Sequence, residues 1–297
     1  MKKLLYTTDL RKASASALQY AFQFSKAIKA NLHLLHIFDL LPIVSSPIRS
    51  RDVNIKNYRI EQQELLKIYC ARHLASNFDI SDLQYHTLRN ESISKAVIQV
   101  SESIDADLVM VGTSKPNSLR GFFSENIANE LMSQLDCPLL ILPEDIIFRG
   151  LSNLLYATDF EESDIQAIQY LVQIAEPFGA KIEIVHIPRK KEYNFKKKMQ
   201  LFKETIKQKV VYPELVFASE TAQDVESGIH HYIDIDNPEM LVMLERERLS
   251  FWQELWHKDL VKKMEFEIGI PLMVFNKKSF TLKLTGQSNY NQALDWT

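Results

Sequence analysis

The sequence predicts an α/β fold made of two repeated, doubly wound domains, each with a five-stranded, mainly parallel sheet and helices on both faces. Two observations predict it. The first is an internal repeat: "LLYTTDL" at residues 4–10 returns as "LLYATDF" at residues 154–160, an offset of 150 positions. The second is that short, nearly continuous apolar runs alternate with longer segments of helical periodicity. That alternation is typical of parallel strands that are buried on both faces and joined by helices.

The repeat extends well beyond this opening motif. Matches at the same offset pair Ala17 with Ala167, Tyr20 with Tyr170, and His36 with His186. Further on, "DLVMVG" at 107–112 and "MLVMLE" at 240–245 match at an offset of 133, so the second copy is shorter in its middle. A period of this length is too long for a solenoid unit and predicts two domains of ordinary size. We expect a domain at 1–145, a second at 150–276 and a C-terminal tail at 277–297.

Apolar runs and helical spacing give the order of elements within each copy. In the first copy we expect strands at 3–8, 31–38, 83–88, 107–112 and 138–142, with helices at 17–28, 57–76, 92–104 and 124–135. In the second copy we expect strands at 151–157, 181–187, 215–219, 240–244 and 271–275, with one helix around 195–206. Ligands bind such a sheet outside the carboxyl ends of its strands. Asp9 and Asp159 fall at that end of the first strand of each copy.

Composition excludes several classes of protein. Apolar residues make up 46% of the chain and charged residues 25%, as in ordinary globular domains, and a net charge of −3 gives no overall attraction to nucleic acid or to anionic membranes. No apolar run approaches the roughly 18 residues that a membrane span needs. Two cysteines in no metal-binding spacing favour free thiols in a reducing compartment. We therefore expect a cytoplasmic protein without a membrane segment.

The order and spacing of these motifs resemble one known family. The strand ending in Thr-Asp, "HLLHI" as second strand, "DLVMVGTS" as fourth and "CPLLILP" as fifth look like a universal stress protein domain. The resemblance covers nearly all of residues 1–143 and, more weakly, 151–276. It implies the Rossmann-like fold of the adenine nucleotide alpha hydrolases and a tandem form of the family.

The resemblance also implies candidate ligand-binding residues. In nucleotide-binding members, the aspartate after the first strand contacts adenosine, and a G-x2-G-x9-G-[ST] loop after the fourth strand holds phosphates at a helix N-terminus. Mapped onto the first copy, these features and their neighbours nominate Thr8, Asp9, His36, Gly112, Thr113, Ser114, Lys115 and Asn126.

The phosphate-binding glycines are largely absent. In the first copy Gly112 matches the first glycine, but Lys115 and Glu125 occupy the positions of the second and third. In the second copy the four motif positions are expected at Glu245, Arg248, Lys258 and Asp259. A carboxylate about 5 Å from a phosphate charge costs roughly 3 kcal/mol at an effective dielectric of about 20. A helix N-terminus returns about 0.3 to 1 kcal/mol, and up to ~2 kcal/mol when partly buried. We therefore expect degenerate pockets and no cofactor, with ATP or AMP in the first copy as the alternative.

The remaining signals favour a binding or regulatory protein over an enzyme. The P-loop, G-x-S-x-G and H-E-x-x-H motifs are all missing from the sequence, and no metal site is expected. The segment 188–209 carries nine basic and two acidic residues, which usually marks a solvated helix face, so nucleic acid is not the expected partner. By resemblance, the two domains should pair within the chain as a pseudo-dimer through their last strands, and a homodimer is a further expectation.

Overall fold

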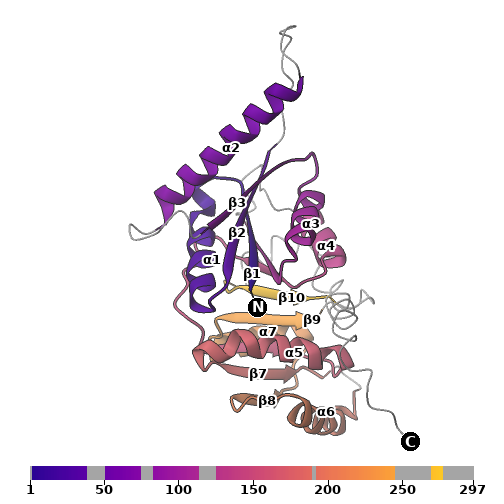
Figure 1. The fold of residues 1–297 in the computed structure, drawn as a ribbon. Helices are drawn as coiled ribbons and strands as arrows, with labels where there is room; N and C mark the ends of the chain where they lie inside the picture. Colours follow the sequence, from indigo (N-terminus) through magenta and orange to yellow (C-terminus); the bar gives the residue numbers. More distant parts are fainter. Residues whose placement is uncertain are drawn as a thin grey trace, which may run out of the picture. The chain divides into compact units, whose positions relative to one another are not determined.

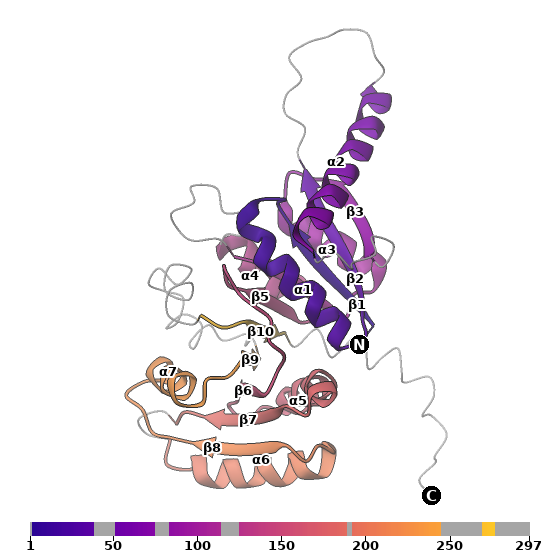
Figure 2. The same cartoon turned by 90° about the vertical axis from the view of Figure 1, so that its left-hand side faces the viewer.

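The computed structural model describes residues 2–38, 51–74, 83–113, 125–188, 192–244 and 269–276, with the side chains of residues 51–56 and 125–126 outside that description. Contacts divide the chain into two compact units, built mainly from residues before and after the boundary between Arg149 and Gly150. Both units have the predicted α/β fold (Figures 1 and 2). The domain limits 1–145 and 150–276 stay predictions, and the tail 277–297 lies outside the described residues.

The first unit is a parallel sheet with the strand order β3-β2-β1-β4-β5. Figure 1 shows α1 and α2 on one face of this sheet and α3 and α4 on the other. Its elements are β1 (Lys3–Thr8), η1 (Lys12–Ser14), α1 (Ala15–Ala27), β2 (Asn31–Phe38), α2 (Arg51–His73), β3 (Leu83–Arg89), α3 (Ile93–Ile104), β4 (Leu108–Gly112), α4 (Glu125–Gln134) and β5 (Leu139–Leu142). The helix expected at 57–76 thus begins earlier, at Arg51.

The second unit repeats this order as β8-β7-β6-β9-β10, again with parallel pairing. In Figure 1, α5 and α6 lie on one face of its sheet and α7 lies on the other. Its elements are β6 (Asn153–Ala157), α5 (Glu162–Ala175), η3 (Glu176–Phe178), β7 (Lys181–His186), α6 (Phe195–Lys209), β8 (Leu215–Ser219), α7 (Val225–Asp236), β9 (Met240–Leu244) and β10 (Leu272–Phe275).

Corresponding hydrogen bonds hold the first strand of each unit. Asp107 Oδ2 accepts from the backbone N–H groups of Lys2 and Lys3, at 2.7 and 3.1 Å. Glu239 Oε2 accepts from Ser152 and Asn153 in the same way, at 3.0 and 2.7 Å. A carboxylate just before the fourth strand therefore ties down the start of the first strand in both units, which fixes how far the first strand's carboxyl end projects.

Strong helix caps set the ends of the connecting elements. Ser92 caps α3 by accepting from Lys95 N, and Asp224 caps α7 by accepting from Ser227 N. Both helices end at a residue with left-handed backbone, Asp105 and Asn237. Side chains that accept orphan N–H groups and left-handed termini are the usual way to satisfy helix ends.

Candidate functional site

The carboxyl end of β1 forms a tight turn in which Thr8 and Asp9 are adjacent. Thr8 is buried, and its Oγ1 accepts from the backbone N–H of Leu10 at 3.1 Å. Leu10 has a φ of 61°, a left-handed conformation that is uncommon for a branched residue. The Thr8 hydroxyl thus stabilises the unusual turn that carries Asp9.

Asp9 is mostly engaged by its own loop. Its Oδ1 accepts from Arg11 N at 3.0 Å and from Ser14 Oγ at 2.6 Å. Its Oδ2 lies 3.2 Å from Arg11 Nε, but it is buried and makes no hydrogen bond of good geometry among the described residues. The side chain is 7% exposed. One carboxylate oxygen therefore has an ion-pair neighbour and unused accepting capacity.

His36 connects the ends of β2 and β1. Its Nδ1 donates to the backbone carbonyl of Thr8 at 3.1 Å, and its Nε2 lies 3.1 Å from Gln62 Oε1. The ring is 8% exposed. An amide can present either its oxygen or its NH₂ group. Gln62 can therefore bond this ring nitrogen whether or not the nitrogen carries a proton. The His36 ring therefore holds the turn after β1 through the Thr8 carbonyl, at the predicted carboxyl edge of the sheet.

Gly112 has a packing reason to be glycine. A Cβ at Gly112 would stand 3.0 Å from the Cβ of Ala17, so β4 approaches α1 more closely than most side chains allow. Thr113 extends the sheet edge, since its N–H and Oγ1 both donate to the Leu142 carbonyl, at 2.9 and 3.3 Å. Of the other candidates, Ser114 and Lys115 lie outside the described residues, as does the Asn126 side chain.

The second unit repeats the turn at the end of β6. Thr158 Oγ1 accepts from the backbone N–H of Phe160 at 2.9 Å, and Phe160 has a φ of 66°. The Phe160 ring packs on His186 with centroids 4.2 Å apart, and on Phe202 at 5.5 Å. Phe160 is the equivalent of Leu10 in the first unit, so an aromatic side chain at this turn covers the buried histidine.

A buried carboxylate, that of Asp164, bonds the residues of this second turn. Asp164, fully buried, accepts from Tyr156 OH at 2.7 Å, from Thr158 Oγ1 at 2.6 Å and from Glu161 N at 2.9 Å. Burial raises the pKa of Asp164 above its ordinary value, while these three hydrogen bonds act to lower it. The Thr158 hydroxyl is thus committed to a partner inside the protein.

His186 occupies the position of His36 but has charged neighbours. Its Nδ1 donates to the Thr158 carbonyl at 2.8 Å and lies 3.4 Å from Asp159 Oδ1. Its Nε2 lies 3.1 Å from Glu192 Oε2. Burial acts to raise the pKa of Glu192, but Lys198, 2.8 Å away, and His186 together hold it below its ordinary value. Asp159 and Glu192 both contact the buried imidazole.

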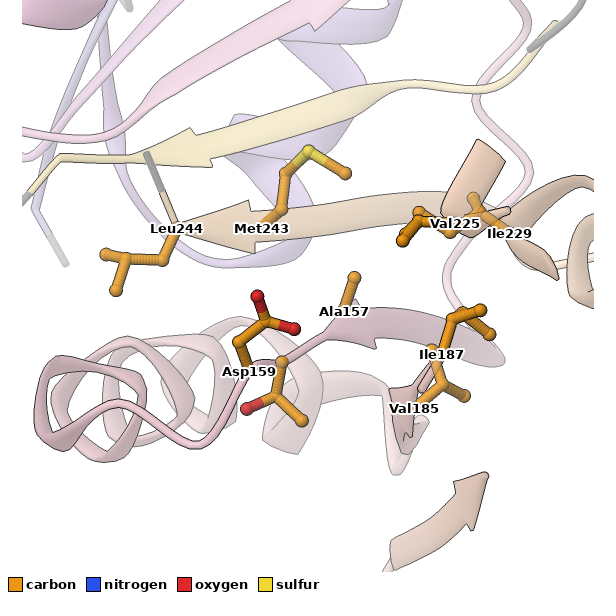
Figure 3. A pocket seen from close by; sticks show the side chains of 9 residues that line it. Ala157, Asp159, Val185, Ile187, Val225, Ile229, Met243 and Leu244 are labelled. Atoms are coloured by element: carbon orange, nitrogen blue, oxygen red, sulfur yellow. The ribbon is translucent and has the colours of Figure 1, made fainter. Parts of the chain in front are cut away.

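The described residues form one small cavity at the edge of the second sheet. The cavity there has a volume of about 20 Å³, which is space for roughly one water molecule. Apart from Thr158 and Asp159 its lining is apolar: Ala157, Val185, Ile187, Val225, Ile229, Met243 and Leu244. Figure 3 shows the Asp159 carboxylate turned toward Met243 and Leu244. Ile187 packs so closely on α7 that a Cβ on Gly228 would stand 2.7 Å from it.

The register of β9 corrects the sequence alignment by one residue. Tyr6 pairs with Met110, whereas Tyr156, its equivalent, pairs with Val242. The offset in this strand is therefore 132, and Leu244 rather than Glu245 occupies the position of Gly112. The expected assignment was wrong because two apolar runs can be aligned equally well at either offset. Only the pairing of β9 with β6 fixes the register. Arg248, Lys258 and Asp259 lie outside the described residues.

Two further histidines of the first unit, His33 and His86, lie on the sheet face opposite to that of His36. His33 Nδ1 and His86 Nε2 are 2.9 Å apart on β2 and β3. Burial, the neighbouring His86 and Lys3 lower the pKa of His33 from 6.5 to about 4. The half-buried ring is thus held neutral at pH 7.

We expect this pair to weaken the first unit in acid. Because the unfolded chain takes up a proton near pH 6.5 and the folded His33 only near pH 4, stability should be lost as pH falls between these values. His33→Gln should flatten that part of the profile. The measurement is the melting temperature from pH 7.5 to 4 for both proteins; identical slopes would contradict the assignment.

The described residues offer no metal-binding cluster and no exposed thiol. They contain no group of three or more histidine, cysteine, aspartate or glutamate side chains that could hold a metal ion. Cys70 and Cys137 are free and buried, and burial raises the pKa of Cys70 to about 12. No helix in this part of the chain is long and apolar enough to cross a membrane.

Sequence reasoning missed Asp164 and Glu192. The repeat carried a signal for the first, because position 164 corresponds to Ser14 at the offset of 150. A serine replaced by an acid five residues after the aspartate of the motif indicates that the two sites differ. Glu192 carried no such signal. It contacts His186 as Gln62 contacts His36, but the two residues are not at matching positions of the repeat.

Comparison with known proteins agrees with this geometry. Residues 1–143 match the model of the universal stress protein family. Over 143 residues the chain is 24% identical to universal stress protein MJ0531 of Methanocaldococcus jannaschii, covering 48% of this chain and 81% of that protein.

Two crystal structures have the fold of nearly the whole chain. A universal stress protein from Archaeoglobus fulgidus DSM 4304 aligns with a TM-score of 0.66 and 16% identity, over 92% of this chain and 98% of its own. The functionally unknown protein PA1789 from Pseudomonas aeruginosa PAO1 aligns with a TM-score of 0.59 and 13% identity, over 97% of both chains. The first half of the chain therefore matches the universal stress protein family, and nearly the whole chain shares the fold of a universal stress protein.

Proposed function

We propose that the protein is a non-enzymatic, regulatory binding protein of the stress response with degenerate nucleotide pockets, the second of which is the more completely closed. The observation that carries the proposal is that the polar groups at the second site are already paired inside the protein. Thr158 donates to Asp164, and Asp159 lies against His186. A nucleotide entering there would have to break these contacts.

Space and packing support the same conclusion for the second unit. The cavity that the described residues form there, about 20 Å³, holds roughly one water, whereas drug-sized ligands occupy pockets of about 300 to 1,000 Å³. Leu244 stands where the first unit has Gly112, and Phe160 is packed on His186. Opening the site would therefore require moving several buried apolar side chains.

The first unit supports the alternative, an adenine-nucleotide sensor that binds ATP or AMP. Asp9 Oδ2 is buried and makes no hydrogen bond among the described residues, so it could accept one from a ligand. Gly112 also keeps the first glycine of the phosphate-binding motif, although its missing side chain makes room for Ala17 of α1. Arg11 beside Asp9 favours the leading proposal instead, because it already balances the carboxylate's charge.

Isothermal titration calorimetry with Mg-ATP and AMP tests both proposals with a matched pair of variants, Asp9→Ala and Asp159→Ala. We expect no binding tighter than millimolar by the wild-type protein. Binding that Asp9→Ala removes and Asp159→Ala leaves intact would establish the sensor in the first unit. If Asp159→Ala weakens binding tenfold, the second unit is open and the leading proposal is wrong. A parallel assay of phosphate release checks the absence of hydrolysis.

Pairing of the two units within the chain, a homodimer and a cytoplasmic location stay predictions. Native mass spectrometry of the freshly purified protein shows whether a ligand stays bound and how many subunits the protein has.

A further inference from the structure

The outer edge of β8 offers hydrogen-bonding groups to a partner. β8 pairs with β7 on one side, and among the described strands it has no neighbour on the other. Ile182 N donates to the Glu214 carbonyl at 2.9 Å. In a parallel ladder, alternate residues bond to the same neighbour, so the N–H and C=O groups of Leu215, Phe217 and Ser219 point away from β7.

A row of lysines on α6 lies beside this edge. Lys196, Lys203 and Lys207, which we call the lysine flank, are separated by seven and four residues and so fall on one side of the helix. Lys203 Nζ stands 5.5 Å from the centroid of the Phe217 ring, which orients this flank toward β8. Figure 2 shows α6 running alongside β8.

A different side of α6, with the buried Phe202 and Ile206, packs on the sheet. Lys198 Nζ bonds Glu192 at 2.8 Å, and Glu192 contacts His186 on β7. The one acidic residue of α6, Glu204, accepts from Gln200. Lys196 and Lys207 are exposed and Lys203 is partly exposed. The lysine flank therefore presents positive charge beside unpaired backbone groups of β8.

We propose that the β8 edge and the lysine flank bind an extended acidic peptide segment, which adds to the sheet as a further strand. Such strand addition takes affinity from main-chain hydrogen bonds and specificity from alternate side chains. Side chains on one face of a strand recur about every 6.6 to 6.8 Å, and Lys203 and Lys207 are about 6 Å apart along the helix. Two acidic residues separated by one residue match that spacing.

Two other occupants fit less well. Phosphodiester groups accept hydrogen bonds but do not donate them, so a nucleic-acid backbone would leave the outward carbonyls of β8 without donors. The chain's own residues 277–297 contain three lysines and one aspartate, and like charge opposes their approach to the lysine flank. The inference does not depend on whether either unit binds a nucleotide.

Fluorescence anisotropy with the full chain and a labelled ten-residue peptide of alternating Glu and Thr tests the proposal. We expect Lys203→Glu/Lys207→Glu to weaken binding at least tenfold. The control, Lys197→Glu/Lys209→Glu, makes the same change in charge elsewhere on α6 and should alter affinity less than threefold. Circular dichroism checks that both variants are folded.

Two further peptides separate strand addition from simple charge attraction. One is N-methylated at every Glu and the other at every Thr, so that each loses the N–H groups of one edge. One of the two should bind at least tenfold more weakly, and the other should retain its affinity. Equal binding of both, no binding of the parent peptide at 1 mM, or equal losses in the two double variants would overturn the proposal. So would tighter binding of a 20-nucleotide oligo-dT that depends on Lys203 and Lys207.

Discussion

Asp164→Ala should lower the free energy of unfolding of the second unit by about 3 to 5 kcal/mol, since each buried donor left without an acceptor costs about 1 to 3 kcal/mol. The substitution strands the hydroxyls of Tyr156 and Thr158 and the N–H of Glu161, all of which donate to this carboxylate. The measurement is urea unfolding combined with hydrogen exchange of α5, which reports the second unit separately.

Two matched variants make the Asp164 result specific. Ser14→Ala, at the equivalent position of the first unit, removes only the bond to Asp9 and should cost about 1 kcal/mol. Asp164→Asn retains an oxygen for two donors and should cost less than Asp164→Ala. A loss below 1 kcal/mol for Asp164→Ala would contradict the role given to this carboxylate.

The same residue predicts a dependence of stability on pH. Because burial raises the pKa of Asp164 above 3.8, the folded protein keeps this proton at pH values where the unfolded chain has lost it. Its contribution to stability is therefore largest in acid and is lost as pH rises through the folded pKa. Asp164→Asn, which cannot ionise, should remove that decline.

His186→Ala should destabilise the second unit by about 2 to 4 kcal/mol, the sum of a lost buried side chain and its hydrogen bonds. The ring is 1% exposed, bonds the Thr158 carbonyl and Glu192, and packs on Phe160. Removing it leaves the Thr158 carbonyl without its donor and opens a cavity beneath Phe160.

The control for His186 is His36→Ala in the first unit. His36 makes the same bond to the preceding strand but faces the neutral Gln62, so its removal breaks no contact with a carboxylate and should cost less. Thermal and urea unfolding, followed by hydrogen exchange of β6 and β1, compare the two. A larger loss for His36→Ala would show that Glu192 does not tie its segment to His186.

The sequence predicted the fold class well because the signals for it are local. The apolar runs of β1, β2, β8 and β9 and the spacing of α3 each lie within a few consecutive residues, and the repeat supplied every element twice. It also located the carboxyl edge, since Asp9 and Asp159 fall at the ends of buried strands. Candidate residues of the first unit could be named by resemblance, although Ser114, Lys115 and the Asn126 side chain lie outside the described residues.

What the sequence alone determined is therefore the repeated α/β architecture and the edge where its loops gather. Only the tertiary structure decided that Leu244 takes in the second unit the position of Gly112 in the first, that Asp164 pairs with Tyr156 and Thr158, and that Lys203 lies beside β8. The physical reason is distance along the chain. Apolar periodicity acts between neighbouring residues, but strand register, the partner of a buried carboxylate and the free side of a helix depend on segments that meet only when the sheet has formed.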